Sequence, residues 1–383
     1  MSKSRVALVR CESYDAEVVE KALARGLALL GGAAVFVRPG EPVLLKPNLL
    51  TPDPPERCVT THPAVFQAVA RLFQAAGSAV VYGDSPAVGS PASVAKKAGL
   101  EAVAAELGVT LADFVTPVEV SFPAGRQNKK FILAKAVADN THALVNLPKM
   151  KTHGLMRATG AVKNLFGCVP GLLKAEFHVK LPNAHPFARM LVDLNLCVRP
   201  RLSIMDGVMA MQGNGPRSGT PLPVHALLIS NDPVALDAVV TRLMDMDPQV
   251  PPTAQYGRES GLGTYLQEEI EILGDTVEAL RPRRFKANKL AVSEKEPKGS
   301  VKFLKQWLVP RPVIARRRCT RCGTCVKMCP VSPKAVDWKA GDKSRPPVYT
   351  YDRCIRCYCC QELCPERAIK IRTPLLGRIV RRG

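Results

Sequence analysis

The chain has 383 residues, 46% of them hydrophobic and 23% charged, which is typical of a globular protein with two or three domains. It contains no run of 18 consecutive apolar residues, and this excludes a membrane-spanning helix of ordinary length. The first ten residues lack the apolar segment and the small-residue cleavage site of a secretory signal, so we expect a cytoplasmic protein.

The net charge of +21 is concentrated toward the C-terminus. Residues 281–383 carry 27 lysines and arginines against 7 aspartates and glutamates, whereas residues 1–280 carry 27 against 26. A positive field of that size attracts acidic partners and accelerates their encounter. Nucleic-acid binding is disfavoured, because few aromatic residues accompany the charges and no nucleic-acid fold signature is present.

Residues 1–114 alternate short apolar runs with amphipathic helical patterns. Strands are predicted at residues 6–9, 42–45, 79–82 and 109–114, and helices at residues 15–30, 62–76 and 90–107. Glycine directly follows each of these helices, as is common at helix C-termini. Strands interleaved with helices favour right-handed βαβ units and a largely parallel sheet.

The pattern continues through residue 244 with one insertion. Residues 118–122 and 131–134 flank Gly125 and predict a β-hairpin. Further strands are predicted at residues 143–147, 202–205 and 226–230, followed by a helix at residues 233–244 with proline in its first turn.

Eight of the thirteen cysteines form two runs with the same spacing, Cys-x2-Cys-x2-Cys-x3-Cys-Pro. Two-residue spacers let three thiolates on one loop reach three irons of a [4Fe–4S] cube, while the fourth ligand comes from the other run. We therefore expect two clusters, the first on Cys319, Cys322, Cys325 and Cys364, and the second on Cys354, Cys357, Cys360 and Cys329. Zinc sites, the main alternative, use paired Cys-x2-Cys or Cys/His groups instead.

Residues 316–372 resemble bacterial two-cluster ferredoxins, with a small insertion between Pro330 and Ala335. Cys359 is an additional cysteine in the second run, expected to be a passive neighbour, with a role as an alternative ligand left open. Arginines and lysines flank the ligands, and free ferredoxins and flavodoxins are typically acidic. We therefore predict an acidic ferredoxin-like or flavodoxin-like electron-transfer partner, whose encounter these charges would accelerate.

These patterns divide the chain into an α/β domain (1–280), a basic linker (281–315), a two-[4Fe–4S] ferredoxin domain (316–372) and a basic tail (373–383). The predicted fold class is α/β, a largely parallel sheet with flanking helices, joined to a small α+β ferredoxin-like domain. Residues 303–309 of the linker could lie on a membrane surface or dock a partner, but packing between the domains is the favoured interpretation.

Several short motifs occur in order along residues 41–245. They are LKPNL (45–49), THP (61–63), GDS (83–85), LPKMKTH (147–153), GAVKNLFG (160–167), MDG (205–207), GNGP (213–216) and DPVALD (232–237). In these motifs the chain resembles the family known as domain of unknown function 362, which is often fused to ferredoxin modules. The resemblance implies a fold and a redox association, but no particular reaction.

Polar side chains follow the predicted strands of this domain, where open α/β sheets bind their ligands. Four lysines, Lys46, Lys149, Lys151 and Lys163, are expected to converge at these strand ends, where their point charges would bind a carboxylate or phosphate. We expect substrate binding by Lys46, Asn48, Lys151 and Asn164, and catalytic or proton-transfer roles for Lys149, Lys163, His153 and Asp84.

Structural roles compete with this interpretation at several positions. A lone lysine or aspartate after a strand is commonly a solvated loop residue, and Asp84 serves equally well as a helix cap. Capping or packing is favoured for Asp232 and Asp237, and His62 could also only cap a helix. Cys168 could be a nucleophile but is expected in the core, as a lone cysteine among apolar residues usually is.

The favoured function is a ferredoxin-linked oxidoreductase that passes electrons from two [4Fe–4S] clusters to an anionic small molecule held in the α/β domain. The alternative is a non-catalytic electron-transfer subunit that docks to a larger redox complex. No Gly-x-Gly-x-x-Gly follows the first strand, so a dinucleotide cofactor is not supported. The Gly213-Asn214-Gly215 loop is weakly indicative of phosphate binding.

Overall fold

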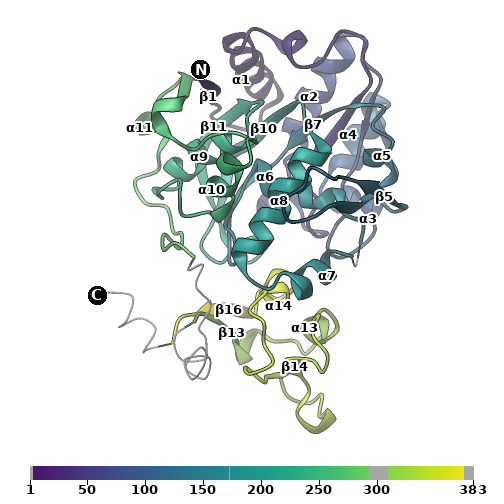
Figure 1. The fold of residues 1–383 in the computed structure, drawn as a ribbon, viewed down its shortest axis with the longest axis vertical. Helices are drawn as coiled ribbons and strands as arrows, with labels where there is room; N and C mark the ends of the chain where they lie inside the picture. Colours follow the sequence, from purple (N-terminus) through teal and green to yellow (C-terminus); the bar gives the residue numbers. More distant parts are fainter. Residues whose placement is uncertain (1–2, 172, 293–308, 375–383) are drawn as a thin grey trace.

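The computed structural model describes residues 3–171, 173–292 and 309–374. Figure 1 shows a large α/β unit, formed by the chain up to residue 292, and a small unit in green and yellow formed by residues 309–374. The small unit lies at one end of the large one, where its helix α14 (Cys359–Glu362) is close to helix α7 (Leu173–Lys180).

A mixed sheet forms the centre of the large unit, with the strand order β12-β1-β11-β10-β7-β2-β3-β4. Along this path only β11 runs antiparallel to its neighbours, so the predicted largely parallel sheet is confirmed. Strand β8 extends the sheet beside β10 and also pairs with β9. The bounds are β1 Ser4–Arg10, β2 Val43–Pro47, β3 Val80–Tyr82, β4 Thr110–Leu111, β7 Ala143–Leu147, β8 Lys149–His153, β9 Arg157–Thr159, β10 Leu202–Gln212, β11 Thr220–Ser230 and β12 Ile270–Gly274.

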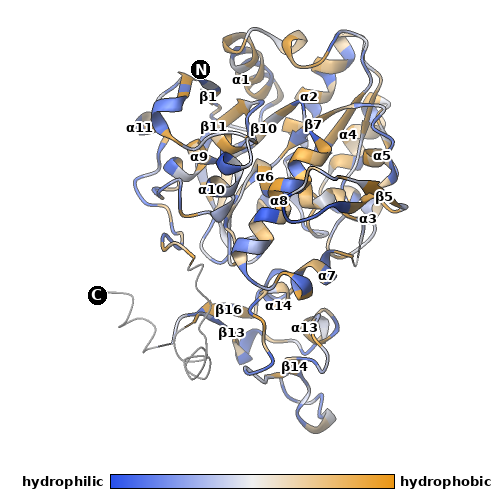
Figure 2. Ribbon diagram, viewed as in Figure 1, coloured by the Kyte–Doolittle hydropathy of each residue, from blue (hydrophilic) through white to orange (hydrophobic). Residues whose placement is uncertain are grey.

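Helices cover both faces of this sheet because strand residues alternate between two cores. Val43 and Leu45 of β2 pack in the core under α1 to α4, whereas Leu44 packs in the core under α8. Figure 2 shows much of the central sheet in hydrophobic colours. The helices are α1 Ala16–Leu29, α2 Pro63–Ala75, α3 Pro91–Lys97, α4 Leu100–Leu107, α5 Lys135–Ala138, α6 Ala161–Asn164, α8 Ala184–Val198, α9 Pro233–Leu243, α10 Pro252–Glu259 and α11 Val277–Leu280, with short 3-10 turns η1 Ala33–Val35, η2 Pro55–Arg57, η3 Leu165–Cys168 and η4 Gln267–Glu269.

The structure corrects several local predictions, among them the strand expected at residues 226–230, which begins at Thr220 as β11. The helix expected at residues 90–107 is two helices, α3 and α4, because Gly99 between them has a φ of +79° that no helix accommodates. The strand expected at residues 109–114 is reduced to the two residues of β4. Strand β10 extends to Gln212, well beyond the apolar run at residues 202–205. The predicted hairpin is confirmed as β5 (Pro117–Ser121) and β6 (Lys130–Ala134).

The small unit contains two antiparallel strand pairs and short helical turns. Its elements are β13 Arg311–Ile314, η5 Arg316–Arg318, α13 Thr324–Lys327, β14 Val336–Asp337, η6 Lys339–Gly341, β15 Val348–Tyr349, α14 and β16 Ile369–Arg372. Strand β13 pairs with β16, so four residues that we expected in the linker are part of this unit. Of the segment predicted to lie between the domains, residues 303–308 fall outside the described residues, as do residues 375–383 of the basic tail.

Hydrogen bonds join the two units. The amide of Gln361 donates to the carbonyls of Asn214 and Gly215, and the amide of Asn214 donates to the carbonyl of Ile369. Arg217 donates to the carbonyl of Leu363. The Gly213–Gly215 loop is thus placed against the small unit. Among the described residues, no helix has the length and apolar character needed to cross a membrane.

Candidate functional site

The eight cysteines of the two runs surround two cavities in the small unit. One has about 340 Å³ of empty space and is lined by Cys319, Cys322, Cys325 and Cys364. The other has about 320 Å³ and is lined by Cys329, Cys354, Cys357 and Cys360. Each cavity takes three cysteines from one run and the fourth from the other, as the spacing predicts, so the donor set fits [4Fe–4S] binding.

Hydrogen bonds reach at least four of these sulfur atoms, and in one of them Thr324 Oγ1 lies 3.3 Å from Cys322 Sγ. The backbone N–H groups of Ala335 and Ala368 lie 3.4 Å and 3.3 Å from the Sγ atoms of Cys329 and Cys364. The Tyr349 hydroxyl donates to Cys360 Sγ over 3.3 Å. Donors to sulfur stabilise the extra negative charge of a reduced iron–sulfur cluster, which suits an electron carrier.

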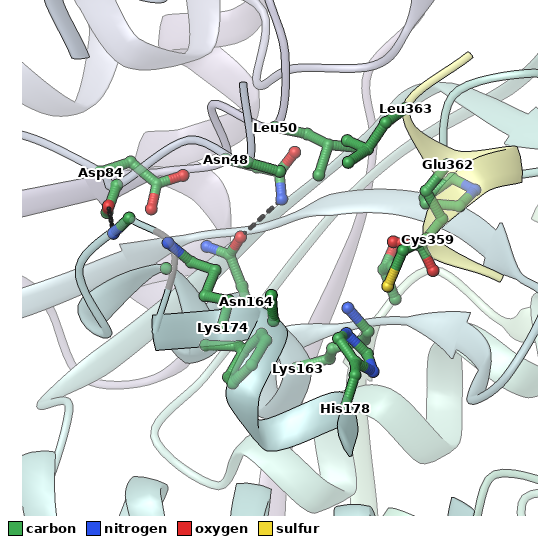
Figure 3. Close-up of a pocket in the computed structure, with 18 of the residues that line it drawn as sticks. Asn48, Leu50, Asp84, Lys163, Asn164, Lys174, His178, Cys359, Glu362 and Leu363 are labelled. Atoms are coloured by element: carbon green, nitrogen blue, oxygen red, sulfur yellow. Dashed lines mark hydrogen bonds between the residues drawn. The ribbon is translucent and has the colours of Figure 1, made fainter. Parts of the chain in front are cut away.

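A pocket lies where the two units meet, with about 890 Å³ of empty space including its open mouth. The α/β unit lines it with polar side chains from several elements, and the small unit closes it with Met328, Cys359, Glu362 and Leu363. Figure 3 shows Cys359, Glu362 and Leu363 on the side opposite Asp84 and Lys174. Five of the eight residues predicted for the site line this pocket: Asn48, Asp84, Lys151, Lys163 and Asn164.

Three of the residues predicted for the site lie on strand β8, on the same side of the sheet. Successive side chains of a strand alternate, so Lys149, Lys151 and His153 point to the same face. All three are buried, with exposures of 1%, 1% and 3%. Their surroundings nevertheless differ, and only Lys151 reaches the pocket.

Lys46 and Lys149 are neutralised by carboxylates of the fold. Lys46 Nζ lies 2.8 Å from Asp84, whose other oxygen accepts the Leu49 N–H. A Cβ at Gly167 would come within 1.8 Å of that carboxylate, so glycine is required beside the pair. Lys149 Nζ lies 2.7 Å from Asp206, away from the pocket.

Asp206 is the centre of a buried network. Its carboxylate accepts hydrogen bonds from the Tyr14 hydroxyl, the His62 backbone N–H and Lys149. The Tyr14 ring stacks on His62 at 3.5 Å, and His62 also caps helix α2 through its Nδ1. Burial lowers the pKa of His62 to about 4, which keeps this ring neutral. Both oxygens of the Asp206 carboxylate therefore accept hydrogen bonds from groups of the protein itself.

Lys151 and the two asparagines form a second network at the pocket wall. Lys151 Nζ donates to Asn48 Oδ1 and to the Val59 carbonyl. The Asn48 amide donates to Asn164 Oδ1, and Asn164 donates to Asn146. Burial and the neighbouring Lys163 lower the pKa of Lys151 to about 7. Asn164 is held on α6, whose first N–H groups are capped by Asp237.

Two other lysines that line the pocket, Lys163 and Lys174, form neither an ion pair nor a hydrogen bond with the described residues. Lys163 has no hydrogen bond or ion pair with any described residue, and its Nζ lies 5.9 Å from the Phe166 ring centroid. Lys174 Nζ is buried without a hydrogen-bond partner in the described part of the chain. Burial lowers the pKa of both amines, that of Lys174 to about 7. Both are suited to binding an anion that the protein does not itself supply.

Two histidines stand between this wall and the small unit. His153 Nδ1 accepts the N–H groups of Leu155 and Met156, while its Nε2 lies 3.1 Å from Glu362 Oε1. Burial acts to raise the pKa of Glu362, but His153 and Lys163 outweigh it and bring it to about 2. His178 lines the pocket, its Nδ1 without a partner among the described residues, and burial lowers its pKa to about 4.

The structure also shows the roles of several residues that the sequence left open. Asp232 caps helix α9 through Val234 and Ala235, as favoured. Cys168 is fully buried in the core, and burial raises the pKa of its thiol to about 12, which does not suit a nucleophile. Cys359 lines the interdomain pocket and not the cavity of the second cysteine set. Lys174 and His178 were missed, although their spacing of four residues on one helix was a usable signal.

The fold and the two cysteine sets define an α/β protein with a fused ferredoxin-type domain that binds [4Fe–4S] clusters. Residues 43–242 match the family described as domain of unknown function (DUF362), and residues 311–365 match the 4Fe-4S dicluster domain. The chain belongs to the DUF362 family and carries an iron–sulfur domain, as its motifs indicated.

Known proteins add the following similarities. The chain is 41% identical over 262 residues to the thylakoid-associated protein sll1697 of Synechocystis sp., covering 67% of this chain and 79% of the relative. The lactate racemase apoprotein from Thermoanaerobacterium thermosaccharolyticum is 12% identical with a TM-score of 0.40, covering 64% of this chain and 57% of that one. A protein from Thermotoga maritima is 10% identical with a TM-score of 0.36, covering 67% and 61%. The chain spans less than two thirds of the length of either solved structure.

Proposed function

We propose that this protein is a ferredoxin-linked oxidoreductase that reduces an anionic small molecule in the interdomain pocket. The observation that carries the proposal is the composition of the pocket wall. Lys174, whose Nζ has no hydrogen bond to any described residue, and Lys163, whose Nζ lies over the Phe166 ring, share this pocket with Cys359 and Glu362. Cys359 directly precedes Cys360 of the second cysteine set, and Glu362 follows Cys360 by two residues. An anion held by these amines would therefore lie beside the electron-carrying domain.

Eight cysteines in two sets would hold two [4Fe–4S] clusters, which supply one electron each when bound. A carbonyl or carbon–carbon double bond that gains two electrons and two protons becomes an alcohol or a saturated bond. Lys163 and Lys174 would bind the anionic groups of the acceptor, while Asn48 and Asn164 orient it. Lys151, with a pKa near 7, could release one of the two protons, and the other would come from solvent at the open mouth of the pocket.

The electrons would come from an acidic ferredoxin-like or flavodoxin-like protein. Arg316, Arg317, Arg318 and Arg321 are exposed next to the first cysteine set and would attract such a donor. A low-potential donor of this kind and cysteine-ligated clusters both belong to a reducing compartment, so we place the protein in the cytoplasm. The thylakoid association in the relative's name raises the further proposal that it works near a membrane surface.

The proposal is tested by acceptor-dependent reoxidation of the reduced protein. Anaerobically purified chain should contain about eight iron atoms, as two [4Fe–4S] clusters do. After reduction by ferredoxin, absorbance near 400 nm should recover on addition of an anionic carbonyl or enoate from a panel of acceptors. Lys163→Met should slow this recovery at least about tenfold, because it removes a charge-assisted contact. Lys180→Met is the control, since Lys180 is exposed on α7.

Two results would contradict the proposal. One is full iron content with no reoxidation by any acceptor of the panel, together with a stoichiometric protein partner, which would identify an electron-transfer subunit. The other is equal reoxidation rates for Lys163→Met and wild type, which would remove the pocket from the reaction.

A further inference from the structure

Helix α7 places two polar side chains against the pocket that the fold leaves without partners. Lys174 and His178 are one turn apart and therefore lie on the same side of the helix. Lys174 Nζ and His178 Nδ1 are both buried and lack hydrogen bonds to any described residue, and His178 is only 7% exposed. A helix that buries such atoms together is shaped for a ligand with complementary groups.

The charges around the pocket are not balanced. Four amines, those of Lys46, Lys151, Lys163 and Lys174, line it or lie directly behind it, against the carboxylates of Asp84 and Glu362. Asp84 is paired with Lys46, and Glu362 contacts His153, whose pKa is lowered by burial to about 4. With every amine protonated, the wall has an excess of two positive charges, which one dianion would neutralise.

The two unpartnered amines belong to different ends of the pocket. Asp84 is the carboxylate whose charge acts on Lys174, whereas Glu362 is the one that acts on Lys163. Figure 3 shows the same division, with Lys174 toward Asp84, and Lys163 and His178 toward Cys359 and Glu362. Apolar side chains, those of Leu50, Phe166, Met328 and Leu363, line the space as well.

We propose that the pocket binds a small dicarboxylate, with one carboxylate on Lys174 and the other on Lys163 and His178, and with its carbon chain along the apolar lining. This rests on the proposed function and deepens it, since it names the class of the acceptor. The end on Lys163 would lie next to Cys359 and thus nearest to the second cysteine set. Two contact points would also fix which carbon atoms face the electron donor.

The test measures binding alone, by isothermal titration of the anaerobic full-length holoprotein. The probes are succinate, glutarate and adipate, each compared with the monocarboxylate of equal length (butyrate, pentanoate and hexanoate), together with inorganic phosphate. At least one dicarboxylate should bind about tenfold or more tightly than its matched monocarboxylate, because the second carboxylate gains a charge-assisted contact.

Substitutions test whether the preference for dicarboxylates depends on Lys174 of α7. Lys174→Met should reduce the affinity of that dicarboxylate at least about tenfold, to the level of the monocarboxylate. Lys163→Met should do the same from the other end, whereas Lys180→Met, on the exposed side of α7, should bind like wild type. Thermal unfolding of each variant verifies that it is folded, and the two pocket variants are independent tests.

Three outcomes would overturn the inference: equal affinities for dicarboxylates and monocarboxylates, tighter binding of phosphate than of every dicarboxylate, or wild-type affinity in Lys174→Met. The result is separate from the proposed function. A dicarboxylate that binds through Lys174 but never reoxidises the reduced protein would sustain the binding site and reject the oxidoreductase.

Discussion

Two groups of lysines in the α/β unit, one fully buried and one partly buried at the interdomain pocket, differ in how their charge is balanced. Lys46 and Lys149 each lie within 2.8 Å of a buried carboxylate, so their charges are compensated within the protein. Lys163 and Lys174 have no such carboxylate within the described part of the chain, and both line the interdomain pocket. Because an uncompensated buried cation is costly, the first group is explained by the fold and the second by a ligand.

The largest expected effect is on the compensated group. Asp206→Ala removes the partner of Lys149 and the acceptor for Tyr14 and His62, leaving a buried cation that is 1% exposed. We expect the free energy of unfolding to fall by about 3–5 kcal/mol. Denaturant unfolding monitored by circular dichroism measures this change. A decrease of less than about 1 kcal/mol in the free energy of unfolding would show that the Lys149–Asp206 pair does not stabilise the fold.

The next effect concerns the pH dependence of anion binding to the second group. Lys174 is faced by Asp84, Lys46, Cys168 and Lys163, and its pKa is lowered to about 7. It is charged below that pH and neutral above it. The affinity for the dicarboxylate that binds most tightly should therefore fall about tenfold per pH unit above pH 7, because binding must take up a proton. Titrations at pH 6.5, 7.5 and 8.5 check this, and a flat profile would contradict it.

A smaller change in the free energy of unfolding is expected when a lysine of each group is replaced by methionine, and this comparison distinguishes the two groups most directly. Lys174→Met removes an uncompensated cation and keeps most of the side-chain volume, so the free energy of unfolding should change by less than about 1 kcal/mol, or rise. Lys149→Met serves as the matched comparison and should destabilise the protein, since it leaves the buried Asp206 charge without its cation. Equal losses for the two variants in denaturant unfolding would remove the distinction between the groups.

The smallest effect is expected at the extra cysteine of the small unit. Cys359 lines the pocket and not the cavity of the second cysteine set, so Cys359→Ala should leave the iron content unchanged. Cys357→Ala, which removes a lining residue of that cavity, is the control and should lower it. Iron analysis and electron paramagnetic resonance of the reduced protein make the comparison. Iron loss in Cys359→Ala would identify it as a ligand.

Much of the fold could be predicted because its signals are local. Glycine and proline mark the ends of helices, and apolar runs such as residues 143–147 match strand β7 residue for residue. The break at Gly99 was missed because the helical pattern continues across it, and only the backbone angle separates α3 from α4. Strand β8 was missed because its alternating lysines gave no apolar pattern, although the sheet buries them.

The sequence by itself determined the cysteine sets, since ligands two or three residues apart must share one loop whatever surrounds them. It also placed lysines and asparagines at the ends of strands, where a sheet gathers them. Only the tertiary structure decided which of those lysines meet a carboxylate, that α7 brings Lys174 and His178 to the same pocket, and that Glu362 closes it from the other unit. The reason is physical: residue type fixes the charge of a side chain, but the cost of burying that charge depends on partners that are distant in the chain.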